Sequence, residues 1–222
     1  MRKPKAPEAN RARILGAALE EFAARGFKGA SMDAIAARTR TTRALINYYF
    51  GGKEQVYLAV LEHVYGEIRH AEDRLDLDHV APVDAIRSIV EFTFDYYLDH
   101  EGFVRLVVAE NQARGRYLRK SRAMRSLNRS IIDTLRRVLE RGQRQGVFRR
   151  DIDALEVHKA IAALGMFNVT NQYTFAAIFQ TEMGANGDVA GRRATATELI
   201  LRYLCRPAVR AHRPARLRRR SR

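Results

Sequence analysis

Arg43 and Asn47 carry side chains that could read the base edges of duplex DNA. A guanidinium can donate two hydrogen bonds to O6 and N7 of guanine, and a carboxamide can pair with N6 and N7 of adenine. The two residues are four positions apart, so one face of a helix would carry both of them. Groups that could bind phosphate oxygens flank the pair, on Thr41, Thr42, Tyr48 and Lys53. This combination predicts an interface with DNA.

Short helices are predicted to position these side chains. The first runs from about Asn10 to Arg25, because apolar residues recur at helical spacing, at Ile14, Leu15, Ala18, Leu19 and Phe22. Gly26 suits the end of this helix, since glycine readily adopts the left-handed conformation found there. Ser31 is typical of the N-cap of a second helix, whose inward residues would be Met32, Ile35 and Ala36.

The break between the second and third helices predicts a helix-turn-helix unit. Residues 39–42 are rich in Thr and Arg, and a third short helix from about Ala44 ends near Phe50, before two glycines. A fourth helix begins at about Lys53. In a helix-turn-helix unit the second helix of the pair enters the major groove and reads bases, while the first lies against phosphates.

Composition favours a polyanionic partner. The formal net charge is +15, from 40 Lys and Arg against 25 Asp and Glu. Residues 1–55 hold eleven basic against five acidic residues, so part of the excess lies in the predicted DNA-binding segment. The alternative is a basic proteome, since arginine greatly outnumbers lysine.

Several other classes of protein are not expected. A single cysteine, Cys205, cannot form an internal disulfide, and no signal peptide or apolar run of ~18 residues is present, so we expect a cytoplasmic protein with no membrane partner. Neither a phosphate-binding loop nor a nucleophile motif is visible, so an enzyme is not expected. His100 and His158 lack metal-ligand spacing with Cys205, so we expect no metal and no cofactor.

The remainder of the chain predicts a larger helical domain. Helices are expected from Pro82, over 103–109, over 116–145, over 152–179, and finally up to Leu204, after a glycine-rich link at 183–191. Small residues in the 152–179 helix would permit close approach of a second subunit, or else burial within one subunit. The arginine-rich residues 206–222 are predicted to be disordered.

A ligand pocket in this domain would recruit aromatic side chains and a few polar groups. The candidates are Phe92, Tyr96, Phe103, Asn111, Phe167 and Asn171. Most of the aromatic residues would belong to the core of any helical bundle. The amides leave three alternatives, namely pocket groups, bonds across a dimer, or exposed positions.

Residues 12–62 resemble the DNA-binding domain of the TetR/AcrR family of bacterial regulators. The resemblance lies in ARGF after the first helix, Ser-Met-x-x-Ile-Ala in the second, and Leu-x-x-Tyr-Tyr-Phe-x-x-Lys-Glu across the third and fourth. It implies an all-α fold of about nine helices, with a small helix-turn-helix domain and a larger ligand-binding and dimerisation domain. It also implies a dimer formed by the last two long helices. By position, it assigns base reading to Thr42, Arg43, Ala44 and Asn47, and phosphate contacts to Ser31, Tyr48, Tyr49 and Lys53.

Two residues depart from the family's pattern. Arg40 stands in the turn where the family usually has glycine, which predicts either a different turn or a strained left-handed residue; it could also contact phosphate. Asn47 replaces a usual tyrosine, which favours base reading over a phosphate contact. Tyr48 and Tyr49 point about 100° apart on a helix, so both cannot face DNA. We expect Tyr49 to be at least partly structural.

These expectations combine into one hypothesis. Residues 1–9 form a basic arm, 10–55 the DNA-binding domain, 56–205 the ligand-binding and dimerisation domain, and 206–222 a basic tail. The dimer would bind a palindromic operator in double-stranded DNA, usually as a repressor, and a small hydrophobic or aromatic effector would release it. The alternative is an architectural DNA-binding protein that responds to no ligand.

Overall fold

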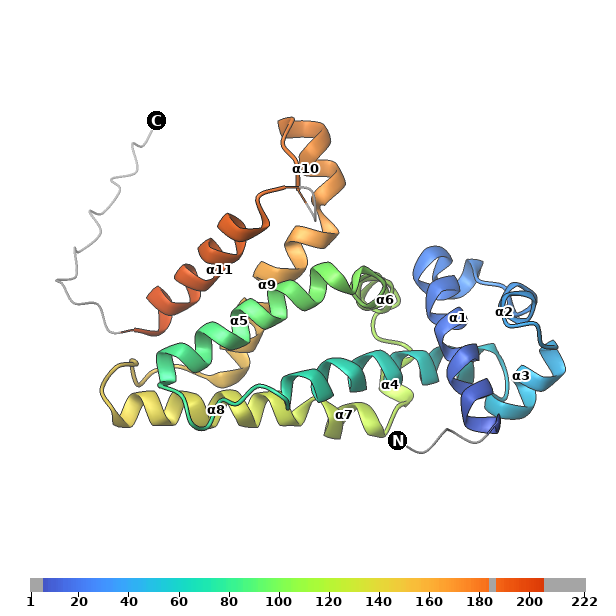
Figure 1. The fold of residues 1–222 in the computed structure, drawn as a ribbon, viewed down its shortest axis with the longest axis horizontal. Coiled ribbons are helices and arrows are strands. Elements are labelled where there is room, and N and C mark those ends of the chain that lie inside the picture. The colour runs from blue at the N-terminus through green and yellow to red at the C-terminus, as the bar shows by residue number, and fades with distance from the viewer. Residues whose placement is uncertain (1–5, 184–186, 206–222) are drawn as a thin grey trace, which may run out of the picture.

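Within the residues that the computed structural model describes, 6–183 and 187–205, the protein consists of helices joined by loops. Figure 1 shows α1 to α3 forming one end of the molecule, with α4 connecting them to the remaining helices. The helices are α1 Ala6–Gly29, α2 Met32–Arg38, α3 Arg43–Phe50, α4 Lys53–Glu72, α5 Pro82–Asp99, α6 Glu101–Gln112, α7 Ala123–Leu127, α8 Arg129–Arg144, α9 Ala154–Thr170, α10 Gln172–Phe179 and α11 Val189–Leu204. None of the helices in these ranges is long and apolar enough to cross a bilayer.

The first helix starts earlier than the sequence indicates. α1 begins at Ala6 rather than near Asn10, so the second half of the expected arm, residues 6–9, is helical; residues 1–5 lie outside the described ranges. Gly26 has φ 63 and ψ 177, so regular helix stops there as expected, and a short helical segment follows to Gly29. The inward residues of α1, including Ile14, Ala18 and Phe22, are buried as their spacing predicts.

The C-terminal domain contains more helices than expected, because two predicted long helices are divided. The helix expected over 116–145 is replaced by a turn and by α7 and α8. Arg114 and Gly115 both have positive φ and reverse the chain. The buried carboxylate of Glu110 then accepts the backbone N–H groups of Tyr117 and Leu118, at 3.2 and 3.1 Å, which holds residues 113–117 in a turn before the short 3-10 helix Leu118–Lys120. The predicted end of α8 is confirmed, since Gly146 follows it with φ 74.

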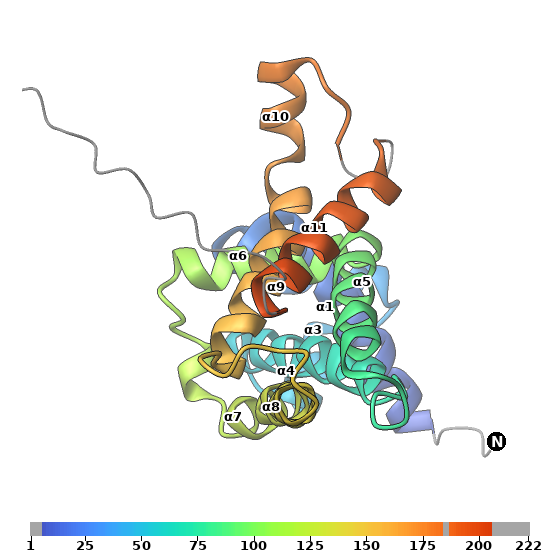
Figure 2. The ribbon, with the colours of Figure 1, turned by 90° about the vertical axis from the view of Figure 1, so that its left-hand side faces the viewer.

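The helix expected over 152–179 divides at Asn171 into α9 and α10. The Asn171 side chain donates to the Thr170 hydroxyl at 2.8 Å, next to the point where the backbone leaves helical geometry. Figures 1 and 2 show that α10 projects away from the other helices. It contains no buried residue, although Phe175 of α10 contacts both Phe167 of α9 and Phe179 at the end of α10. The expected basic tail, 206–222, lies outside the described ranges.

An aromatic cluster packs at the boundary between the small N-terminal domain and the larger domain. The ring of Phe27, which follows Gly26, lies 5.3 Å from Tyr57 of α4 and 4.4 Å from Tyr117, measured between centroids. Tyr57 and Tyr117 are themselves 5.1 Å apart, and both are buried. α6 packs along α1, where Gly102 approaches Ala23 closely. The hydrophobic core is therefore continuous between the small N-terminal domain and the larger domain.

Candidate DNA interface and ligand sites

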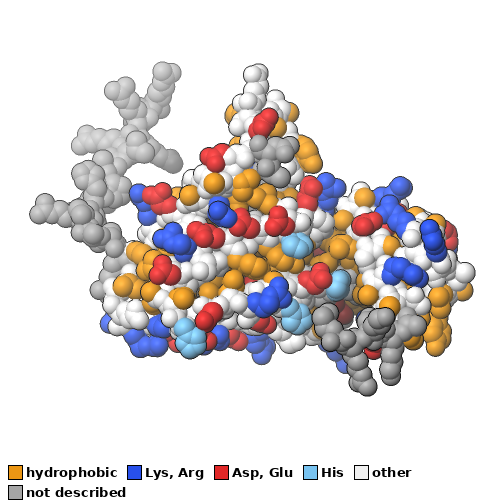
Figure 3. Space-filling view, in the orientation of Figure 1, with side chains coloured by type: hydrophobic (Ala, Val, Ile, Leu, Met, Phe, Trp, Pro, Cys, Tyr) orange, Lys and Arg blue, Asp and Glu red, His pale blue; other side chains and the backbone are white. Residues whose placement is uncertain are grey.

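One side of α3 is anchored in the core and the opposite side faces solvent. Ile46 is fully buried, whereas Arg43, Ala44, Asn47 and Tyr48 are exposed, Tyr48 by 82%. The hydroxyl of Thr42 accepts the Leu45 N–H at 3.1 Å and so caps the helix. The candidate base-reading residues therefore lie at the N-terminal end and on the outer face of one short, capped helix. Figure 3 shows Lys and Arg side chains on this end of the molecule.

The guanidinium of Arg43 lies near a carboxylate of α2. Its Nη1 lies 3.7 Å from Oδ2 of Asp33 in α2, and both side chains are largely exposed. An exposed pair of this kind contributes little to stability. Arg43 therefore remains available to a stronger hydrogen-bond acceptor, such as a guanine edge.

The turn between α2 and α3 contains a strained residue. Arg40 has φ 48, so it occupies the left-handed conformation that glycine adopts without strain. Its N–H donates to the Ala37 carbonyl at 3.2 Å, and the Thr41 N–H donates to the Ala36 carbonyl at 3.0 Å. The buried Thr39 hydroxyl also donates to Ile35 O, at 2.8 Å. The sequence left open either a different turn or a strained left-handed residue at Arg40, and the structure shows the left-handed residue.

The candidate phosphate-binding residues differ in how accessible their polar atoms are. Tyr48 is exposed, whereas Tyr49 is partly buried against the core, as expected. The Ser31 hydroxyl caps α2 by accepting the Ala34 N–H at 3.3 Å. The Thr41 hydroxyl is enclosed and has no hydrogen-bond partner among the described residues. Lys53 donates to Lys28 O at 3.3 Å and lies 5.0 Å from the Phe27 ring, so it braces the domain.

Glu21 links α1 to the start of α2, a role that the sequence analysis missed. Its side chain is fully buried, and Oε1 accepts the Ser31 N–H at 3.0 Å. The Nε of Arg25 lies 3.3 Å from the same oxygen. The only sign of this role in the sequence was the position of Glu21 next to the apolar face of the first predicted helix. This contact fixes where α2, and with it α3, begins.

The six predicted pocket residues do not converge on one cavity. Phe92 and Tyr96 line an open pocket of about 510 Å³ between α4 and α5. Phe167 lines a different hollow of about 340 Å³ between α9 and α11. Phe103 belongs to the core, Asn111 is exposed and bonds to Val107 O, and Asn171 lies at the break before α10.

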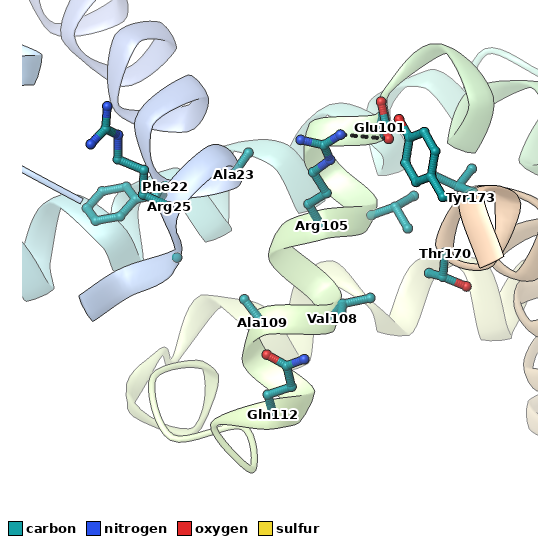
Figure 4. A pocket seen from close by; sticks show the side chains of 13 residues that line it. Phe22, Ala23, Arg25, Glu101, Arg105, Val108, Ala109, Gln112, Thr170 and Tyr173 are labelled. Carbon is teal, nitrogen blue, oxygen red and sulfur yellow. Dashed lines mark hydrogen bonds and ion pairs between the residues drawn. The ribbon is translucent and has the colours of Figure 1, made fainter. Parts of the chain in front are cut away.

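A separate cleft lies where α1 meets α6, with a volume of about 460 Å³. Figure 4 shows Phe22, Ala23 and Arg25 of α1 on one side, across from Arg105 and Ala109 of α6. Thr170 and Tyr173, from the end of α9 and the start of α10, complete the wall. None of these residues was among the predicted pocket residues, because the cleft depends on how two distant helices pack.

A polar cluster is enclosed in the larger domain. Arg69 and Glu72 form a buried ion pair, with Nη1 and Oε2 2.9 Å apart, and the Nε of Arg69 has no hydrogen-bond partner among the described residues. Burial raises the pKa of the Glu72 carboxyl to about 7, against the opposing effect of Arg69. Burial and, to a smaller extent, the charge of Arg69 lower the pKa of His158 to about 4, so this imidazole is neutral at pH 7.

Comparison with known proteins accounts for both parts of this architecture. Residues 14–60 match the model of bacterial regulatory proteins of the tetR family, and residues 82–200 match that of the tetracyclin repressor-like C-terminal domain. The chain is also 35% identical over 204 residues to the HTH-type transcriptional repressor NicS of Pseudomonas putida, covering 91% of this chain and 96% of that protein. The chain belongs to the TetR family. The all-α fold and the helix-turn-helix domain are thereby confirmed.

Other members of the TetR family are similar over different parts of the chain. The repressor SCO4008 of Streptomyces coelicolor is 37% identical over 111 residues, which are 49% of this chain and 53% of that protein. Among solved structures, SCO4942 from Streptomyces coelicolor superposes with a TM-score of 0.66 and 27% identity, covering 89% of this chain and 99% of that chain. The protein is accordingly a DNA-binding transcriptional regulator of the TetR family.

Proposed function

We propose that the protein is a dimeric repressor that binds a palindromic operator and is released by a small hydrophobic or aromatic ligand. The observation that carries this proposal is the outward face of α3, where Arg43 and Asn47 are exposed on a helix anchored by Ile46. Their donor and acceptor patterns suit guanine and adenine edges in the major groove. The relatives NicS and SCO4008 are both named as transcriptional repressors, which supports the direction of regulation.

Dimerisation through α9 and α11 would present two copies of α3 to one duplex. These helices pack against each other and leave large apolar side chains exposed, namely Leu155, Phe167, Leu199 and Tyr203. Apolar residues left exposed together favour burial by a second subunit. A two-fold axis there would place the two copies of α3 on half-sites about 34–36 Å apart, which corresponds to one turn of DNA.

Ligand-dependent release is supported by the size of the larger domain and by its cavities. A solved relative with the same fold, FadR of Bacillus subtilis, was crystallised in complex with stearoyl-CoA; its TM-score is 0.63 at 17% identity. In this chain, a ligand that binds the DNA-incompetent arrangement more tightly would shift the population away from the operator-bound form.

Selection of bound sequences from random duplexes by the full chain tests the proposal. We expect two related half-sites in inverted orientation, with centres about one helical turn apart. Arg43→Ala should weaken binding to the selected operator by about 1–3 kcal/mol and relax the preference at one position of each half-site. The matched control is Arg87→Ala, which removes an exposed arginine of α5 and should leave base preference unchanged.

Two outcomes would overturn the proposal. Recovery of sequences without a shared half-site would indicate an architectural DNA-binding protein. An Arg43→Ala variant with the wild-type preference at every position would remove α3 as the reader of bases.

A further inference from the structure

We propose that the cleft between α1 and α6 binds an amphipathic carboxylate and that this ligand is the effector that weakens DNA binding. The claim that the cleft binds such a ligand is based on its geometry. The claim that the ligand weakens DNA binding rests on the function proposed above. The site lies at the junction of the two domains, whereas the six predicted pocket residues all lie within the larger domain.

The cleft has the volume and the apolar lining of a small-molecule binding site. Its volume of about 460 Å³ falls in the range of about 300–1,000 Å³ that is typical for such sites. Apolar side chains from three helices line it, namely Phe22, Ala23, Val104, Val108, Ala109 and Val169. The helices α1 and α6 are close together beside it, since a Cβ added at Gly102 would lie 3.7 Å from the Ala23 side chain and 3.8 Å from that of Leu19. An apolar ligand body would therefore meet a surface that already exists.

The rim of the cleft carries an excess of hydrogen-bond donors. Arg25 and Arg105 reach it from α1 and α6, and the only carboxylate among the residues that line the cleft belongs to Glu101. That carboxylate already accepts from Arg105 at 2.9 Å and from the Gln172 amide at 3.1 Å. Both guanidiniums already pair with one carboxylate each, and both keep further N–H donors that can bond to added acceptor oxygens. A ligand carboxylate would supply them to either guanidinium in the fork geometry that arginine favours.

Arg25 connects the cleft to the DNA-binding helices. Its Nε contacts the buried Oε1 of Glu21, and the same oxygen accepts the N–H of Ser31 at the start of α2. A ligand carboxylate that binds Arg25 competes directly with Glu21 for the guanidinium. The buried carboxylate of Glu21 would then lose its nearer cation and keep only Arg38, whose Nη2 lies 3.8 Å from Oε2, which is costly at a fully buried site. The start of α2, and the angle at which α3 is presented, would become less fixed.

Binding can be tested without DNA, with the anionic dye anilinonaphthalene sulfonate and the full chain. The chain contains no tryptophan, so Gln112→Trp places a single tryptophan at the rim of the cleft. We expect energy transfer from that tryptophan to bound dye, and much weaker transfer in Val80→Trp, whose tryptophan lies at an exposed position before α5. Decanoate should displace the dye at lower concentration than decanol, which has the same chain length but no charge.

Substitutions of arginine test the assigned groups. Arg25→Gln and Arg105→Gln should each weaken dye binding at the cleft at least fivefold, whereas Arg87→Gln, the same change at an exposed site on α5, should not. Absence of energy transfer from Gln112→Trp, or equal displacement by decanoate and decanol, would overturn the assignment of the site or of its ligand class.

Regulation is tested separately on a selected operator. Decanoate should lower the operator affinity of the wild-type chain severalfold, and decanol should not. If the chain selects no operator while dye binding in the cleft follows the arginines, the proposed function fails and the binding site stands. If an operator is selected and decanoate does not change its affinity, the regulatory step of this inference is wrong.

Discussion

Individual polar residues fix the start of α3, the helix proposed to read DNA. Thr42 and Ser31 cap α3 and α2, and Glu21 holds the Ser31 N–H from a fully buried position. Capping by Ser31 was predictable, because a serine hydroxyl satisfies an orphan N–H of the first turn. The role of Glu21 was not, because it depends on the angle between α1 and α2.

Arg40 allows a test of whether its left-handed backbone conformation destabilises the protein. Arg40→Gly should raise the free energy of unfolding by about 0.5 kcal/mol, since relief of roughly 1 kcal/mol of left-handed strain is partly offset by the greater freedom of glycine in the unfolded chain. Urea denaturation measures this difference. If Arg40 also contacts phosphate, the salt dependence of operator affinity should become shallower by about one unit for each arginine removed from a contact.

Arg114 provides the matched control for this substitution. It is an exposed arginine with φ 57, so Arg114→Gly relieves the same strain at a site outside the helix-turn-helix. The two variants should gain similar stability, but only Arg40→Gly should change the salt dependence. A loss of stability in Arg40→Gly would show that the left-handed conformation is not strained.

At the level of helices, periodicity identified where most elements lie but not where two of them divide. The stretches 116–145 and 152–179 keep enough apolar residues at helical spacing to suggest one helix each. In the first stretch, the Glu110 carboxylate accepts two backbone N–H groups seven and eight residues later; in the second, the break lies at Asn171, whose side chain donates to the Thr170 hydroxyl. An acid within the otherwise apolar run Val107 to Glu110 was a signal that such a contact existed.

The connection after α8 makes a prediction about helix packing. A Cβ at Gly142 would lie 2.0 Å from the ring of Phe148, which is fully buried beneath α8. Gly142→Ala should therefore lower the free energy of unfolding by about 1–3 kcal/mol, the usual range for overpacking, despite the better helix propensity of alanine. Thermal or urea unfolding of the full chain measures the change.

Gly16 in α1 is the control for this substitution, since the Cβ it would gain meets nothing within 4 Å apart from the backbone of its own helix and its chain neighbours. Gly16→Ala should be neutral or stabilise by up to about 1 kcal/mol. A Gly142→Ala variant as stable as Gly16→Ala would mean that Phe148 can move aside without cost.

At the scale of the whole molecule, the sequence predicted the two domains but not the cleft between them, because the cleft depends on how their helices pack into one continuous core. The apolar faces of α1, α4 and α6 are each visible as periodic patterns, whereas their mutual angles are set by contacts such as Phe27 against Tyr117. The cleft and the Arg25–Glu21–Ser31 contacts are products of those angles. Base-reading candidates could be predicted because they lie on a single helix.

The last prediction concerns the dimer interface proposed at α9 and α11. If α9 and α11 form the dimer interface, Leu199→Glu would place a charge in it, while the monomer fold should be preserved because Leu199 is 51% exposed. We expect the dimer dissociation constant, measured by sedimentation, to rise at least tenfold, which corresponds to about 1.4 kcal/mol. Operator affinity should fall in parallel, because a monomer gains contacts from only one α3. Val80→Glu, at an exposed valine before α5, should change neither quantity. A Leu199→Glu chain that remains a tight dimer would place the two-fold axis elsewhere and would require a different spacing of half-sites.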